Sequence, residues 1–76
     1  MEIAFTLAKP QRVEIVLYDL RGRRVTTLLQ ERRPAGPNSV VWEGIDSQGR
    51  QVASGNYFAR IEAGSFMAEK RLTLIR

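Results

Sequence analysis

The segment VEIVLYDLRG, residues 13–22, combines an alternating strand with a four-residue turn. Val13, Ile15 and Leu17 occupy every second position, which is the period of a strand with one buried face. Residues 19–22 then place an aspartate early and a glycine late, as is typical of a reverse turn. This segment therefore predicts the first strand and the turn of a β-hairpin.

The second strand of the hairpin is expected over about 23–29, where the period of two is interrupted. A β-bulge near Thr26 and Thr27 would account for the interruption, and so would a short helix. The β-branched run Val25-Thr26-Thr27 favours the strand, because such side chains fit a pleated surface.

Alternation and turn signals continue on both sides of the hairpin. Further strands are expected at 3–7, 39–43, 51–53, 56–63 and 66–75, the third of them a short edge strand. The segment 30–38 contains two prolines, so we expect a loop that crosses between sheets. The sequence predicts an all-β, immunoglobulin-like sandwich of about seven antiparallel strands, with residues 1–76 as a single domain.

The inward-facing positions of these strands define the expected core. It consists of Phe5, Val13, Ile15, Leu17, Val40, Trp42, Tyr57, Ile61, Leu72 and Leu74. Trp42 could instead be a platform for stacking sugars, together with Tyr18 or Phe58. Its alternation with Val40 favours a place in the core.

The composition argues against catalysis. The chain has no cysteine and no histidine, which removes disulfides, thiolate zinc sites and the commonest general base. The carboxylates have no spacing that predicts a shared cleft. The segment 46–49 has an aspartate but lacks the further oxygen ligands of a calcium loop, so a turn explains it better. We expect no enzyme activity, no catalytic residue, no cofactor and no metal site.

Basic residues outnumber acidic ones by twelve to eight, which gives a formal net charge of +4. The arginines cluster at 21–24 and at 32–33. Nucleic-acid binding would require them to be interleaved with exposed aromatic side chains, and no such platform is evident. We therefore expect no nucleic-acid and no simple-sugar binding. A solvated surface explains the charge most simply, and an anionic glycan or lipopolysaccharide fits it better than nucleic acid.

Further motifs follow the hairpin in a fixed order. They are AG at 35–36, VWEG at 41–44, Asp46 with Gly49-Arg50, SGNYF at 54–58 and KRLTLIR at 70–76. With the hairpin, they resemble the immunoglobulin-like domain of the flagellar hook-capping protein family. They resemble still more closely the related C-terminal sorting domains of type IX secretion cargo. Glu43 departs from the family pattern, which usually has aspartate after the tryptophan, and we expect it to change a turn contact but not the fold.

The resemblance implies a non-catalytic C-terminal module of a larger secreted protein. Such a module directs its parent across the outer membrane of a Gram-negative bacterium, or attaches it to the cell surface. Its partner would be the secretion machinery or a component of the cell envelope. A structural assembly domain of the hook-cap type and an accessory carbohydrate-binding module remain alternatives. No apolar run reaches the ~20 residues that a transmembrane helix needs.

In the resembling sorting domains, the final stretch is the part implicated in recognition by the export machinery. The corresponding residues of this chain are Lys70, Arg71, Leu72, Leu74 and Arg76. A simpler alternative is that the two leucines close the sandwich while the charged side chains are solvated.

Overall fold

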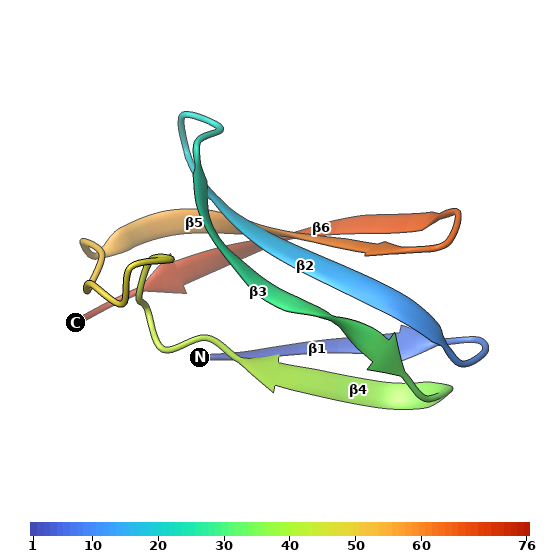
Figure 1. The fold of residues 1–76 in the computed structure, drawn as a ribbon. Coiled ribbons are helices and arrows are strands. Elements are labelled where there is room, and N and C mark those ends of the chain that lie inside the picture. Colours follow the sequence, from blue (N-terminus) through green and yellow to red (C-terminus); the bar gives the residue numbers. More distant parts are fainter.

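Six strands and no helix make up the fold in the computed structural model, which describes residues 1–76 (Figure 1). The strands are β1 (Glu2–Leu7), β2 (Gln11–Asp19), β3 (Arg24–Arg33), β4 (Gly36–Val41), β5 (Gly55–Ala63) and β6 (Phe66–Leu74). No helix is present that is long and apolar enough to cross a membrane.

The strands form two layers, as expected for an immunoglobulin-like sandwich. One sheet has four strands in the order β3-β2-β5-β6, and the other has β1 and β4. Every paired strand is antiparallel to its neighbour. Figure 1 shows the β1–β4 pair on one side of the larger sheet, while the tip of the β2–β3 hairpin points away from that pair.

The core lies between the two layers and confirms the alternation seen in the sequence. Along β1, exposed and buried residues alternate at every position. Eight of the ten predicted core residues belong to a cluster of 13 buried side chains, and the other two, Val40 and Leu74, are half-buried against it. The cluster also contains five residues that were not on the predicted list: Ile3, Leu7, Leu29, Ala59 and Ala63.

The β2–β3 hairpin is confirmed, and so is the irregularity in its second strand. The pairing shifts once between Ile15 and Val16 and again between Leu17 and Tyr18. Leu28 and Val25 are the residues left without a partner, so bulges lie on either side of the pair of threonines. The strand interpretation is therefore correct, and the helix alternative is wrong.

The predicted loop at 30–38 is wrong in its extent. β3 continues to Arg33 and β4 begins at Gly36, so only two residues link them. Pro37 lies within β4, opposite Thr6 of β1. A proline is tolerated there because β4 has a neighbour on one side only. The chain does cross from one sheet to the other at this link, as predicted.

The fold has six strands instead of about seven, because the edge strand predicted at 51–53 does not form. That segment is reduced to a single bridge between Ile45 and Gln51. The loop between β4 and β5 is held mainly by turns and side-chain hydrogen bonds, described below, so it needs no ladder partner. The strand predicted at 39–43 ends at Val41, although Trp42 still exchanges backbone hydrogen bonds with Met1 at 2.8 and 3.0 Å.

Candidate functional site

The residues predicted to recognise a partner lie on β6 and just after it. β6 pairs only with β5, so its other edge is free. Because side chains alternate along a strand, Lys70, Leu72 and Leu74 share the inner face, whereas Arg71 lies on the outer face. Leu72 is buried in the core and Leu74 is half-buried against it. The predicted residues are therefore not brought together on one surface.

Lys70 and Arg76 connect separate parts of the chain. The Lys70 ammonium group donates to the carbonyl of Ala4 on β1. Arg76 donates through Nε to the carbonyl of Val52 at 2.7 Å and through Nη2 to the carbonyl of Gly44. Both acceptors lie in the loop between β4 and β5. Arg76 thus anchors this loop to the end of β6, a role that the sequence pattern did not reveal.

Arg71 differs from the other predicted recognition residues because its charged group lies on the outer face of the sheet. Its guanidinium carbon lies 5.6 Å from the centroid of the Phe58 ring, within the range of a cation–π contact. Arg71 takes part in none of the four ion pairs of the chain. Its charge is therefore free to meet an external anion.

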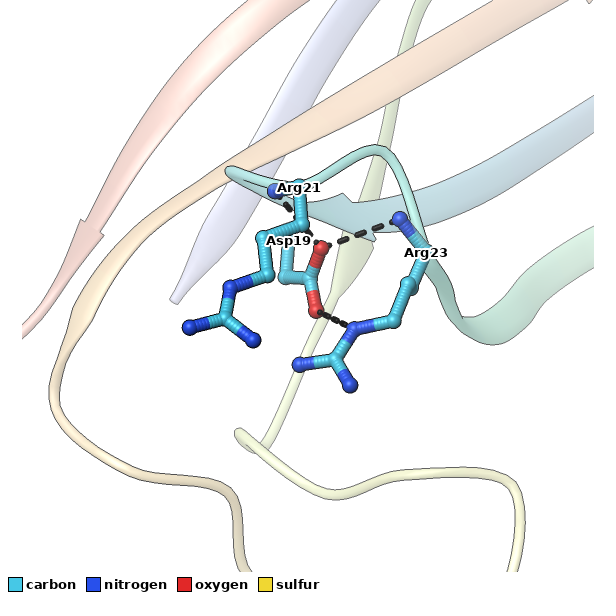
Figure 2. A network of polar contacts seen from close by, with 3 residues as sticks. All are labelled: Asp19, Arg21 and Arg23. Carbon is cyan, nitrogen blue, oxygen red and sulfur yellow. Dashed lines mark hydrogen bonds and ion pairs between the residues drawn. The ribbon is translucent and has the colours of Figure 1, made fainter.

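Two turns share one five-residue motif, DLRGR at 19–23 and DSQGR at 46–50. In both, the backbone N–H of the aspartate donates to the carbonyl of the last arginine, and the glycine N–H donates to the aspartate carbonyl. The Asp19 carboxylate accepts the N–H groups of Arg21 and Arg23 and pairs with the Arg23 side chain, each at 2.9 Å (Figure 2). The repeated motif was visible in the sequence but was not recognised there.

Asp46 repeats the arrangement of Asp19. Its Oδ1 accepts the N–H groups of Gln48 at 2.9 Å and Arg50 at 3.0 Å, and its Oδ2 lies 3.5 Å from Nε of Arg50. The hydrogen bond from the Arg50 backbone lowers the pKa of Asp46 below the usual 3.8, and that from Arg23 lowers the pKa of Asp19 in the same way. Both oxygens of Asp46 are engaged within the turn, which supports a structural role over calcium binding.

The two turns lie side by side at one end of the sandwich. The N–H of Ser47, in the second turn, donates to the carbonyl of Val25, just after the first turn, at 3.2 Å. Arg21 and Arg24, from the first turn and the start of β3, have no carboxylate partner. This end of the molecule therefore carries unpaired positive charge.

Cross-strand pairing places four residues in one row across the four-stranded sheet. Tyr18 on β2 pairs with Arg24 on β3 and with Phe58 on β5. Phe58 in turn pairs with Arg71 on β6. We call these four residues the aromatic–arginine row. No aromatic–basic platform was expected from the sequence, because the strand register that brings these four residues together cannot be read from it.

A hollow of about 280 Å³ lies beside the row, between the sheet and the hairpin tip. Its lining consists of Tyr18, Asp19, Leu20, Gly22, Phe58, Arg60 and Glu69. Leu20 projects from the tip and is 58% exposed. The Nε of Arg60 makes no hydrogen bond, and its carboxylate partner, Glu62, lies 3.8 Å away. The hollow thus combines aromatic rings with polar groups that are not fully engaged.

Trp42 is excluded from any surface platform. It is 1% exposed, as predicted for a core residue, and its Nε1 donates to the carbonyl of Ile45 at 2.9 Å. Of the three aromatic residues weighed for sugar stacking, only Tyr18 and Phe58 reach the surface, where both are half-buried.

Comparison with known families agrees with this architecture. The family model described as the FlgD Ig-like domain matches residues 1–65, which contain β1 to β5 and the turn before β6. No curated protein and no solved structure matches the chain. The family match supports the relation to the flagellar hook-capping family and stops short of the predicted recognition residues at 70–76. The chain belongs to the family of FlgD Ig-like domains.

Proposed function

We propose that this chain is a non-catalytic structural domain that assembles with other protein domains, in the manner of the immunoglobulin-like domain of flagellar hook caps. The match to the FlgD Ig-like family over residues 1–65 carries this proposal. In support of it, the polar side chains at the turns and at the C-terminal end of β6 are engaged in holding loops and strands together.

Free strand edges offer a means of assembly. The four-stranded sheet ends in β3 and β6, and each strand of the smaller sheet has one open edge. Unpaired N–H and C=O groups along such edges can accept a strand from a neighbouring protein. The start of β6 also exposes Phe66 by 48% and Met67 by 56%. A neighbour that adds a strand to β6 would cover both side chains.

A groove next to the β6 edge also favours this edge as the place where a neighbouring strand binds. It has a volume of about 520 Å³ and lies on the open side of the sandwich, between β6 and β1. Phe66, Ala68 and Lys70 line it from β6, and residues 4–6 line it from β1. A side chain of the neighbouring strand would fill this groove, while Lys70 would favour an acidic one.

Domain replacement in a hook-capping protein tests the assembly proposal. We expect the chain to replace the native immunoglobulin-like domain and to retain hook formation. Met67→Glu should reduce hook formation because it places a charge at the edge of β6 that the neighbouring strand would cover. Val41→Glu is the control, since Val41 is an equally exposed apolar residue on β4. Equal activity of both variants, or no activity of the folded chimera, would refute the proposal.

Secretion and surface attachment form the second candidate function. In that case the domain directs a larger parent protein across the outer membrane of a Gram-negative bacterium, and the protein is secreted or held at the cell surface. The free edge of β6 favours this candidate, because the export machinery could pair with that strand. Arg71 would then meet acidic groups of the secretion machinery or of a cell-envelope component.

A reporter fusion tests the second candidate. In a host that carries type IX secretion, an exported reporter joined to the domain should reach the cell surface. Deletion of 70–76 is unsuitable, because it removes the buried Leu72 and would unfold the sandwich. Arg71→Glu should instead retain the fold and reduce surface delivery, whereas Arg12→Glu, with the same charge change on β2, should not. Surface delivery without the domain would exclude sorting.

A further inference from the structure

We propose that the outer face of the four-stranded sheet binds a carboxylate-bearing polysaccharide through the aromatic–arginine row. In this site Tyr18 and Phe58 stack against a sugar ring, and Arg24 and Arg71 bind carboxylate groups of the polysaccharide. The inference concerns a different face from the β6 edge, and it stands or falls independently of the assembly function. It agrees with the sequence-based expectation that an anionic glycan fits the charge better than nucleic acid, and it assigns such a ligand to particular residues.

The aromatic centre of the row is suited to a sugar ring. Tyr18 and Phe58 are direct cross-strand partners on the two central strands of the sheet. Side chains at such positions lie about 5 Å apart, and both of these line the same hollow. The C–H groups on one face of a pyranose pack on surfaces of this kind. Leu20, on the hairpin tip, supplies an apolar wall beside them.

The ends of the row supply positive charge. Four adjacent strands span about 14 Å, which is long enough for more than one sugar unit. Arg24 lies at one end and Arg71 at the other, and neither forms an ion pair within the chain. A guanidinium group binds a carboxylate through two parallel hydrogen bonds, and its contact with an aromatic ring leaves those donors available. The Arg71 guanidinium group already makes such a contact with the Phe58 ring.

The neighbouring rows favour a polysaccharide over a nucleic acid. In the strand register, Arg60 on β5 lies opposite Glu69 on β6, and Glu14 on β2 lies opposite Glu62 on β5. Carboxylates beside a stacking surface accept hydrogen bonds from sugar hydroxyl groups. A DNA backbone has no hydroxyl groups that could donate to them. The mixed charge of this face therefore fits a polymer that carries hydroxyl groups beside its carboxylates.

Titration calorimetry with defined oligosaccharides tests the proposal. The probes are oligogalacturonate, neutral cello-oligosaccharides and single-stranded oligothymidylate, each with the intact chain at about physiological salt. We expect binding of oligogalacturonate that weakens as salt rises, and much weaker binding of the other two. Tighter binding of the oligonucleotide, equal binding of the neutral sugar, or no binding of oligogalacturonate would overturn the proposal.

Variants of the same face separate a built site from general charge attraction. Arg71→Gln and Arg24→Gln should each raise the Kd for oligogalacturonate about fivefold. Arg12→Gln is the matched control, since it removes the same charge from the outer face of β2 at the far end of the sheet. It should change the Kd less than about twofold. Equal effects of Arg12→Gln and Arg71→Gln would overturn the proposal.

The stacking component needs its own variant. Phe58→Leu retains an apolar side chain at a half-buried position and removes the aromatic ring. We expect it to raise the Kd about tenfold while the thermal melting curve stays cooperative. In nuclear magnetic resonance spectra of the parent chain, oligogalacturonate should shift the Tyr18 and Phe58 ring signals and leave the buried Trp42 signal in place. Unchanged binding by Phe58→Leu would exclude stacking on this ring.

Discussion

The ring of Trp42 meets the ring of Tyr57 edge to face, with the centroids 5.2 Å apart and an interplanar angle of 71°. The pair joins the residue directly after β4 to the start of β5, across the longest loop of the chain. Each ring also bonds to that loop through its polar atom, Trp42 to the carbonyl of Ile45 and Tyr57 to the carbonyl of Ala53. The two aromatic residues therefore position a loop that has almost no strand pairing of its own.

Replacement of Trp42 by alanine should be strongly destabilising. The side chain is 1% exposed in the core cluster, so its removal leaves a large cavity. We expect Trp42→Ala to lower the free energy of unfolding by ~3–5 kcal/mol, measured by urea denaturation. Phe66→Ala is the control, because Phe66 is 48% exposed and should cost less than ~1 kcal/mol. Identical midpoints for Trp42→Ala and the parent would contradict the core placement.

The Tyr57 hydroxyl group should contribute separately from its ring. It donates to the carbonyl of Ala53 at 2.6 Å, a contact that resembles the tyrosine corner of immunoglobulin-like sandwiches. Tyr57→Phe retains the ring and should lower the free energy of unfolding by about 1 kcal/mol. Tyr18→Phe, whose hydroxyl group bonds to no other residue, should change it by less than ~0.5 kcal/mol. Equal effects of the two variants in urea denaturation would argue against a structural role for the Tyr57 hydrogen bond.

Two glycines with positive φ should differ in their tolerance of a side chain. Gly22 has φ +80° and open space around it, so Gly22→Ala should cost about 1 kcal/mol from backbone strain alone. Gly44 has φ +73°, and an added Cβ would lie 2.6 Å from Nη2 of Arg76 and 3.1 Å from Cδ2 of Leu74. The flexible Arg76 side chain can move aside but would lose its hydrogen bond to the Gly44 carbonyl, so Gly44→Ala should cost up to about 1 kcal/mol more than Gly22→Ala. Thermal melting of both variants measures the difference, and equal costs would contradict the packing of Arg76 over this loop.

The two aspartate turns should make stability depend on pH under acidic conditions. Folding lowers the pKa of Asp19 and of Asp46, mainly through hydrogen bonds from the backbone of Arg23 and Arg50. Their contribution is thus fully present above the usual pKa of 3.8 and is lost as the pH falls through the lower folded-state values.

Urea denaturation from about pH 6 to about pH 2 measures this dependence. In the double variant Asp19→Asn, Asp46→Asn, the amide oxygen can still accept the backbone hydrogen bonds, but the side chain no longer titrates. We expect the acid-induced loss of stability to be smaller in the variant than in the parent. A parent and a variant that lose stability in parallel would show that these two carboxylates are not responsible.

Local patterns in the sequence predicted most of the fold. Alternation identified β1, β2, β5 and β6, because a strand with one buried face needs apolar side chains at every second residue. Asp19 with Gly22, and Asp46 with Gly49, marked turns that form with the expected hydrogen bonds. The predictions failed at the link between β3 and β4 and at 51–53, where few apolar side chains alternate and tertiary contacts set the strand ends.

The candidate site could be predicted only in part. Arg71 was identified from a resemblance, but its position over Phe58 depends on the β5–β6 register. Lys70 contacts a residue 66 positions away in the chain, and Arg76 contacts a residue 32 positions away. Separations of this size leave no periodic signal, so none of these contacts could be inferred from the sequence alone.

The sequence by itself determined which side of each strand is buried, because alternation is a local property that burial of apolar side chains enforces. That property placed Val13 and Ile15 inside. Only the tertiary structure decided which exposed residues became neighbours. Tyr18 and Phe58 are 40 positions apart, yet the antiparallel register between β2 and β5 makes them direct partners between two arginines. A shift of that register would move the pair apart, and it is the packing of the whole core that prevents such a shift.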